Sequence, residues 1–377
     1  MKFRVSAAFA AFLFILFGGM GHVNFRPFTF DVETLAGATV KESSPNVRNV
    51  EADEPGRPRP GDPPVSSVAI LNKQLNVPAG IRLIVFSPHP DDESLAASGL
   101  IQRVRETQGK VRVVFMTNGD GYKEGVRRRL MRTETTSSDF LEYGKIRHDE
   151  AVQAVCQLGL QPEDAVFLGF PDAGIDDLWT DYWSRLKPYT SPFTRFDSPP
   201  YKECFSQVVK YAGVDLSNEI ARVIEDFAPD WVLMPDPRDQ HPDHYTTGVF
   251  VLDALRKLNQ EGAISFANTR ILTYLVHYLD YPEARTWIKQ VNRTGVGGTP
   301  FIESILAETE WLNLPLTPQE LEGKWHAIEA HQSQFSMLGD FFKRFLRPPY
   351  ELFGEMDAAQ ALAIPQVYAA ALKRRNS

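Results

Sequence analysis

Cysteine and histidine are both scarce in this chain of 377 residues, which contains two cysteines and eight histidines. Cys156 and Cys204 can form at most one disulfide bond within the chain. Cys156 stands among Val152, Val155 and Leu158, a pattern that favours a thiol buried in an apolar core. Against so few histidines, a histidine motif that occurs twice stands out from the background composition.

Positive charge is also in short supply. The 40 lysines and arginines are outnumbered by 48 acidic residues, which gives a net charge of −8 and an isoelectric point near 5.6. A nucleic-acid partner normally requires a basic stripe, so the composition argues against one. The hydrophobic content of 43% suffices for a sizeable core in one large or two ordinary domains.

A long uncharged apolar run occurs at the N-terminus. Lys2 and Arg4 precede VSAAFAAFLFILFGGMG, residues 5–21, an arrangement typical of an export signal. Extended to Val23 the run is 19 residues long, close to the roughly 20 that a membrane-spanning helix needs. Both alternatives for residues 1–23, signal peptide or membrane anchor, predict an exported protein that is periplasmic, extracellular or held at the membrane.

The remainder of the chain divides by composition. Residues 24–64 include a stretch rich in proline and charge without apolar periodicity, which predicts an extended or disordered linker. Residues 65–377 are expected to form a single catalytic domain with an insertion near 175–214. The aromatic residues of this insertion could stack on sugar rings or form the core of a lid; they are Trp179, Tyr182, Trp183 and Tyr189.

Short apolar runs alternate with helical stripes through the predicted domain. Such alternation predicts an α/β three-layer α/β/α sandwich with a Rossmann-like, mostly parallel sheet. The expected strands are residues 81–87, 110–118, 165–170, 230–236 and 271–279, and the expected helices include residues 97–104, 144–158, 220–227 and 242–255.

The tripeptide His-Pro-Asp occurs twice, in SPHPDDESLAASGLI at residues 87–101 and in QHPDHYTTGVFVL at residues 240–252. Each copy follows a predicted strand. Open parallel sheets bind ligands where loops leave the carboxyl ends of strands, so both copies are expected on the same rim of the sheet.

Proline is favoured in the first turn of a helix, so Pro90 and Pro242 are expected to begin helices. In that case His89 and Asp92, three residues apart, project to one side, and the second copy repeats this spacing. Three ligands of the His, His and Asp type with an open fourth position describe a catalytic zinc site. Asp91 is then left as a carboxylate able to take a proton from water.

A single His-Pro-Asp segment would more often be a helix cap with a solvated carboxylate. Capping alone would also explain Glu93 and Ser94, which suit a first helical turn. Two copies at equivalent places after strands favour the metal site.

These motifs resemble the PIG-L/LmbE-like family of zinc-dependent de-N-acetylases. The resemblance depends mainly on HPDDE and HPDH and extends over RHDEA, LGFPD, PDPRDQHPDH, YLVHYLDYP and KWHAIEAHQSQ, from about residue 81 to about residue 334. It implies zinc, with Fe²⁺ as an alternative, bound by His89, Asp92 and His244. It also implies that Asp91 is the general base, that His241 stabilises the oxyanion or protonates the departing amine, and that Asp243 orients a histidine.

The resemblance further implies contacts with a sugar. Arg147 and Asp172 match positions that contact the sugar in relatives, although a surface helix charge and a turn-forming aspartate are alternative explanations. His277 matches a histidine found in one branch of the family, and a core histidine at a strand end is the alternative.

The implied activity is hydrolysis of an N-acetylated amino sugar of the N-acetylglucosamine type, carried by a small molecule or glycoconjugate, with release of acetate and a free amine. Two alternatives stay open. One is a metal-dependent amidase acting on another acylated glycoconjugate, and the other is a carbohydrate-binding relative without turnover.

Overall fold

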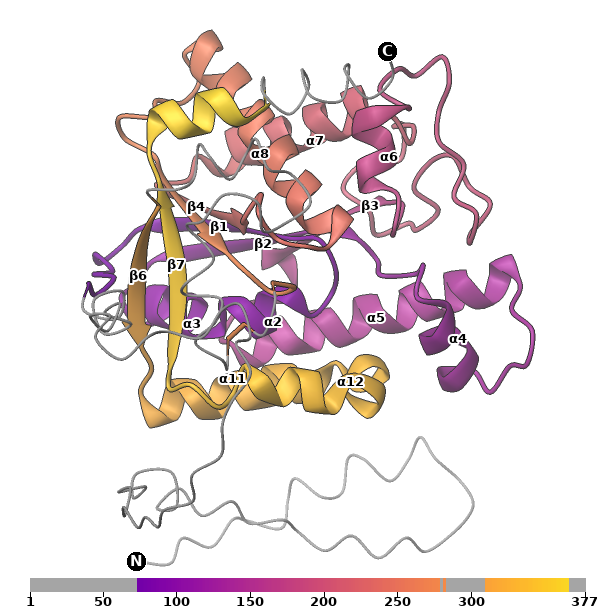
Figure 1. Cartoon of the computed structure of the whole chain (residues 1–377), viewed down its shortest axis with the longest axis horizontal. Coiled ribbons are helices and arrows are strands. Elements are labelled where there is room, and N and C mark those ends of the chain that lie inside the picture. The colour runs from indigo at the N-terminus through magenta and orange to yellow at the C-terminus, as the bar shows by residue number, and fades with distance from the viewer. Residues whose placement is uncertain (1–72, 279–280, 283–308, 366–377) are drawn as a thin grey trace, which may run out of the picture. The chain divides into compact units, whose positions relative to one another are not determined.

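The strands form one mixed sheet of seven in the order β3-β2-β1-β4-β5-β7-β6 (Figure 1). The computed structural model describes residues 73–278, 281–282 and 309–365, all of them within one compact unit, Pro63–Ser377. The predicted signal peptide or anchor and the predicted linker lie outside the described residues. Within the described ranges, no helix has both the length and the apolar character needed to cross a bilayer.

Five neighbouring strands are parallel, and two antiparallel strands complete one edge of the sheet. The parallel strands are β1 (Arg82–Ser87), β2 (Lys110–Thr117), β3 (Ala165–Phe170), β4 (Trp231–Pro235) and β5 (Arg270–Tyr274). β7 (Tyr350–Met356) pairs antiparallel with both β5 and β6 (Glu310–Pro315).

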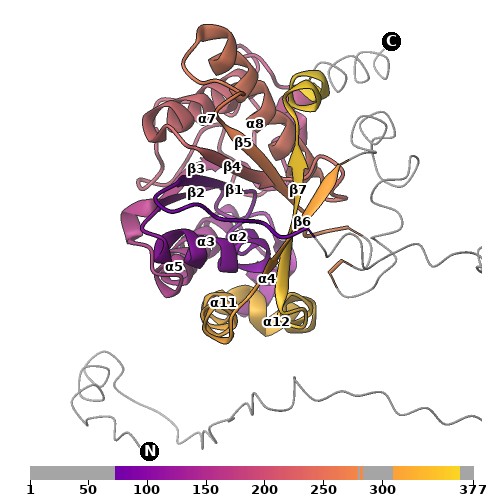
Figure 2. The same ribbon diagram turned by 90° about the vertical axis from the view of Figure 1, so that its left-hand side faces the viewer.

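Helices cover both faces of the sheet (Figure 2). One layer contains α2 (Asp92–Ala96), α3 (Ser98–Glu106), α5 (Ser137–Gln157), α11 (Pro318–Ala330) and α12 (Gln332–Arg344). The other contains α6 (Ile175–Thr180), α7 (Gly213–Phe227) and α8 (Pro242–Glu261). Two short elements, α4 (Lys123–Arg129) and the 3-10 turn η2 (Pro162–Asp164), precede α5 and β3 respectively.

Strand β1 shows why the sheet needs two helical layers. Leu83 and Val85 lie in the hydrophobic core on one face, while Ile84 and Phe86 lie in the core on the other, and all four are fully buried. Side chains alternate between faces with a period of two, so a strand that is apolar at every position must be covered on both sides. The predicted three-layer α/β sandwich with a mostly parallel sheet is confirmed.

Several local predictions were wrong. The expected strand at 271–279 ends at Tyr274, because the chain turns there toward the second His-Pro-Asp loop. The helix expected from residue 144 begins at Ser137, where Thr136 and Asp139 form a reciprocal cap that satisfies the first backbone N–H groups. Cys156 is exposed on α5 and Cys204 is buried; both thiols are free.

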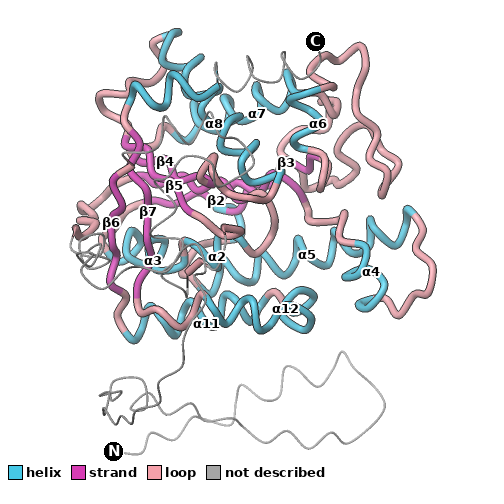
Figure 3. The backbone as a smooth tube through the Cα atoms, in the orientation of Figure 1, coloured by secondary structure: helices cyan, strands magenta, loops and turns pink. Residues whose placement is uncertain are grey.

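The segment near 175–214 contains α6 followed by irregular chain up to α7 (Figure 3). Its aromatic side chains pack on one another and on α8. The ring centroids of Trp179 and Phe250 are 4.9 Å apart, and those of Trp179 and Trp183 are 5.3 Å apart. These contacts favour the hydrophobic-core explanation of the aromatic residues over stacking on sugar.

Candidate metal centre and active site

The two His-Pro-Asp loops leave the carboxyl ends of β1 and β4, which are neighbours in the sheet. From β1 the chain first adds β2 and β3 on one side, and it then returns to place β4 on the other side. A reversal of strand order is the switch point beside which open α/β sheets bind their ligands. Residues far apart in sequence therefore meet at one place.

Three possible ligand atoms form a nearly equilateral triangle at this switch point. The Oδ2 atom of Asp92 lies 3.2 Å from Nδ1 of His89 and 3.2 Å from Nε2 of His244, and the two nitrogens are 3.3 Å apart. Bonds of about 2.0–2.2 Å to a tetrahedral metal put ligand atoms about 3.3–3.6 Å apart, so the three side chains fit zinc with one position left open. Two histidines and one carboxylate also suit Fe²⁺.

A carboxylate faces the remaining nitrogen of each of these histidines. Nε2 of His89 lies 3.2 Å from Oδ2 of Asp243, which accepts a 2.7 Å hydrogen bond from the backbone N–H of Ala173. Nδ1 of His244 lies 3.6 Å from Oδ2 of Asp239. Such carboxylates fix the tautomer and orientation of a metal-binding imidazole. The geometry is therefore that of a prepared metal site.

The side chain of Asp91 binds Arg147. Its Oδ2 accepts a 2.9 Å hydrogen bond from Nη2 of Arg147. Burial raises the pKa of Asp91 to about 7, although the Arg147 charge opposes this rise. Its backbone φ of 148° is unusual for a residue other than glycine, and strained conformations of this kind concentrate at functional sites.

The same backbone conformation explains one wrong prediction. Pro90 does not begin a helix, because Asp91 turns the chain before α2 starts at Asp92. The prediction for Pro242 is confirmed, since this proline is the first residue of α8. The two copies of the motif therefore have the same sequence but different backbones.

His241 stands at the start of α8 and lies beside the triangle. Its ring centroid is 4.9 Å from that of His89 and 5.1 Å from that of His244. Nδ1 accepts a hydrogen bond from the backbone N–H of Asp243 at 3.3 Å, so the proton of the neutral ring is on Nε2. Burial and the neighbouring histidine charges lower the pKa of His241, which favours this neutral donor.

Residues 84–255 match the sequence model of the family described as PIG-L: GlcNAc-PI de-N-acetylase. The matched part, 172 of the 377 residues, runs from β1 to α8 and includes both His-Pro-Asp motifs. No curated protein matches the chain in sequence.

Several solved structures resemble this chain at low sequence identity. The conserved protein TT1542 from Thermus thermophilus is 19% identical, with a TM-score of 0.43, over 73% of this chain and 94% of its own. The A40926 pseudoaglycone deacetylase Dbv21 is 16% identical, with a TM-score of 0.47, over 73% and 96%. The N,N'-diacetylchitobiose deacetylase from Pyrococcus horikoshii is 16% identical, with a TM-score of 0.43, over 74% and 84%.

The three residues expected to contact a sugar all lie near the triangle. Arg147 is buried and donates hydrogen bonds to Asp91 and to the backbone carbonyls of Pro90 and Gly119, so it is not a surface helix charge. Oδ1 of Asp172 lies 3.3 Å from Nε2 of His89. The ring centroid of His277 lies 4.8 Å from that of His244.

Sequence reasoning missed two groups of this candidate site. Asp239 was not singled out, although it stands in the quoted PDPRDQHPDH segment, two residues before the second motif. It accepts backbone N–H groups of Val276 and His277 at 2.9 and 3.0 Å and so joins the loops after β4 and β5. Glu93 was explained by capping, but its side chain is fully buried and faces His331.

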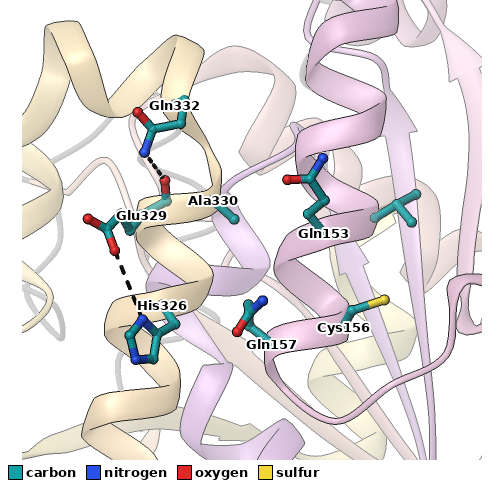
Figure 4. A pocket seen from close by; sticks show the side chains of 8 residues that line it. Gln153, Cys156, Gln157, His326, Glu329, Ala330 and Gln332 are labelled. Carbon is teal, nitrogen blue, oxygen red and sulfur yellow. Dashed lines mark hydrogen bonds and ion pairs between the residues drawn. The ribbon is translucent and has the colours of Figure 1, made fainter. Parts of the chain in front are cut away.

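A separate groove lies between α5 and α11 (Figure 4). Its lining residues are Val152, Gln153, Cys156, Gln157, His326, Glu329, Ala330 and Gln332. None of the predicted site residues lines it. His326 lines this groove with a half-exposed ring beside Glu329, on the same helix that leads to the buried His331.

Proposed function

We propose that this protein is a metal-dependent hydrolase that removes the acetyl group from an N-acetylated amino sugar. The observation that carries the proposal is the triangle of ligand atoms from His89, Asp92 and His244. The carboxylate of Asp91, the residue next to Asp92, is not part of this triangle and hydrogen-bonds to Arg147. Three ligands with an open position are typical of hydrolytic rather than structural metal sites.

Zinc held by His89, Asp92 and His244 would polarise the acetyl carbonyl and lower the pKa of water to about 7. Asp91 would take a proton from the attacking water, and its pKa, which burial raises to about 7, suits a general base that works near neutral pH. Arg147 keeps the carboxylate in place during this transfer.

His241 would act on the other side of the reaction. Its Nε2–H would donate to the oxygen that becomes negatively charged when water adds to the carbonyl. An amide nitrogen leaves only after it is protonated, and Asp91 can return the proton it has taken. Acetate and a free amine are the products.

The substrate class follows from the family rather than from a single contact. The family description names a de-N-acetylase of GlcNAc-PI, which is an N-acetylglucosamine conjugate. Arg147, Asp172 and His277 lie close enough to the triangle to be part of the sugar site. An N-acetylglucosamine-type glycoconjugate is therefore the proposed substrate.

The test measures acetate released from a panel of N-acetylglucosamine conjugates by the full-length protein, with and without a chelator. Acetate release that is abolished by the chelator and restored by Zn²⁺ supports the proposal. Release of a different acid from other acylated glycoconjugates would support the amidase alternative. Sugar binding by calorimetry without any hydrolysis would support a binding protein and contradict the proposal.

Export remains a prediction from the N-terminal sequence, because that segment lies outside the described residues. We propose that the catalytic unit acts outside the cytoplasm, either free or held by residues 1–23. Expression with and without residues 1–23, followed by cell fractionation, tests this. A full-length chain found wholly in the cytoplasmic fraction would contradict it.

A further inference from the structure

Glu93 and His331 form a buried pair behind the proposed general base. Their side chains are 0% and 1% exposed, and Nε2 of His331 lies 3.1 Å from Oε1 of Glu93. The hydroxyl of Ser94 donates to the same carboxylate oxygen at 2.7 Å. A carboxylate that is removed from water needs a cationic partner or several hydrogen-bond donors. The hydroxyl of Ser94 and the imidazole of His331 face the Glu93 carboxylate in these roles.

The second oxygen of Glu93 faces the backbone of the catalytic loop. Oε2 accepts the backbone N–H of Asp91 at 3.1 Å and the hydroxyl of Ser87 at 3.3 Å. The φ of 148° at Asp91 is unfavourable for any residue other than glycine. A strained conformation persists only where its surroundings hold it, and the bond from Glu93 acts directly on the strained peptide.

His331 lies close in sequence to a contact between this part of the chain and α5. It stands at the junction between α11 and α12, and two residues later both oxygens of Glu150 bind Ser333, at 2.9 Å to its N–H and 2.6 Å to its hydroxyl. Glu150 lies on α5, one turn after Arg147, which holds the side chain of Asp91. Helix α5 therefore supports Asp91 by two routes, through its side chain and through its backbone.

From these contacts we infer that Glu93 and His331 are positioning residues that hold the backbone of Asp91 in the conformation required for proton transfer. His331 lies beyond residues 84–255, the part of the chain that matches the family model. The junction of α11 and α12 is thus part of the catalytic apparatus rather than only packing on the sheet. This inference rests on the proposed function of Asp91 as general base.

The kinetic test compares Glu93→Ala, Glu93→Gln and His331→Ala with wild type on an N-acetylglucosamine conjugate. Loss of a positioning contact typically costs about 10- to 100-fold, and the loss is expected in kcat at unchanged KM for Glu93→Ala and His331→Ala. Zinc content by elemental analysis should stay at the wild-type value. Glu93→Gln retains an oxygen for the Asp91 N–H, so it is expected to regain most of the lost rate.

His326→Ala is the matched control, because this histidine lies five residues earlier on α11 with a half-exposed ring that faces Glu322 and Glu329. It should leave kcat and zinc content unchanged. Equal losses in Glu93→Gln and Glu93→Ala, or the same loss in His326→Ala, would overturn the positioning role. If the alanine variant folds poorly, Glu93→Leu takes its place, because leucine fills a similar volume but cannot accept the Asp91 N–H.

Crystal structures of wild type and Glu93→Ala give a readout that needs no substrate. We expect Asp91 to leave its positive φ in the variant and its carboxylate to move away from Arg147. If Asp91 keeps its positive φ and its contact with Arg147 in the variant, the inference fails even if the protein is an active deacetylase. If wild type releases no acetate from any amino sugar, the proposed function fails, while the structural comparison still decides what Glu93 does.

Discussion

Nη2 of Arg147 lies 2.9 Å from Oδ2 of Asp91 and 2.7 Å from the carbonyl oxygen of Pro90. One guanidinium group therefore binds both the side chain of the proposed base and the backbone just before it. The family resemblance implied that Arg147 contacts a sugar. Because this arginine is 3% exposed and donates its hydrogen bonds to the protein itself, we expect that orienting Asp91 is its main effect.

Replacement of Asp91 by asparagine should abolish most activity without loss of metal. The amide cannot accept a proton from water, and general acid–base catalysis contributes about 10²- to 10⁴-fold. Asp91→Asn is therefore expected to lower kcat by about that factor and to keep the wild-type zinc content. Elemental analysis beside an acetate assay checks both points. Loss of zinc in this variant would show that Asp91 is a ligand and not the base.

Replacement of Arg147 by lysine distinguishes an orienting residue from a sugar-binding one. Lysine keeps the charge, but it cannot donate to Asp91, Pro90 and Gly119 through one planar group. The expected result is a fall in kcat of about 10- to 100-fold with KM unchanged. Steady-state kinetics on an N-acetylglucosamine conjugate supply the measurement. A rise in KM at constant kcat would instead support direct contact with the sugar.

Metal content should depend on His244 and, less strongly, on Asp239. His244→Ala removes one of three ligands, so the purified variant is expected to contain little zinc. Asp239→Asn removes only the carboxylate that faces Nδ1 of His244, and it is expected to weaken zinc binding by about 10- to 100-fold. Zinc titration with a chelating indicator measures both. Wild-type affinity in His244→Ala would refute the ligand assignment.

Much of the fold was predictable because its signals are local. Apolar runs such as residues 81–87 predict strands. The two copies of His-Pro-Asp indicated which loops meet at the candidate site. β6 and β7 were not predicted. They are antiparallel strands at the edge of the sheet, and long connections separate β5 from β6 and β6 from β7 in the chain. Their register depends on pairing with distant strands, which short-range patterns do not encode.

The candidate site also has parts that the sequence predicts and parts that it does not. The family resemblance of HPDDE and HPDH implied the three residues of the triangle, whereas the spacing within each motif indicated only that a metal site of the His, His and Asp type was favoured. The positive-φ turn at Asp91 could not be predicted, because Pro90 favours a helix that begins at the proline itself. The pairing of Glu93 with His331 joins residues 238 positions apart. No periodicity connects them, and the packing of α11 against α2 and α5 brings them together.

The buried pair of Lys324 and Glu351 gives a prediction about stability that is independent of the chemistry. Nζ of Lys324 lies 2.9 Å from Oε1 of Glu351, both side chains are 2% exposed, and the carboxylate also accepts backbone N–H groups of Gly99 and Leu100. Lys324→Met leaves a buried carboxylate without its cation, which should lower the free energy of unfolding by about 3–5 kcal/mol.

Chemical denaturation monitored by circular dichroism measures this loss. The double variant Lys324→Met with Glu351→Gln removes the uncompensated charge, so it should recover part of the stability. Because the pair binds the backbone of α3 rather than a residue of the metal site, kcat per folded molecule should match wild type in both variants. A single variant as stable as wild type would mean that water reaches the Glu351 carboxylate and that the pair does not stabilise α11 on α3.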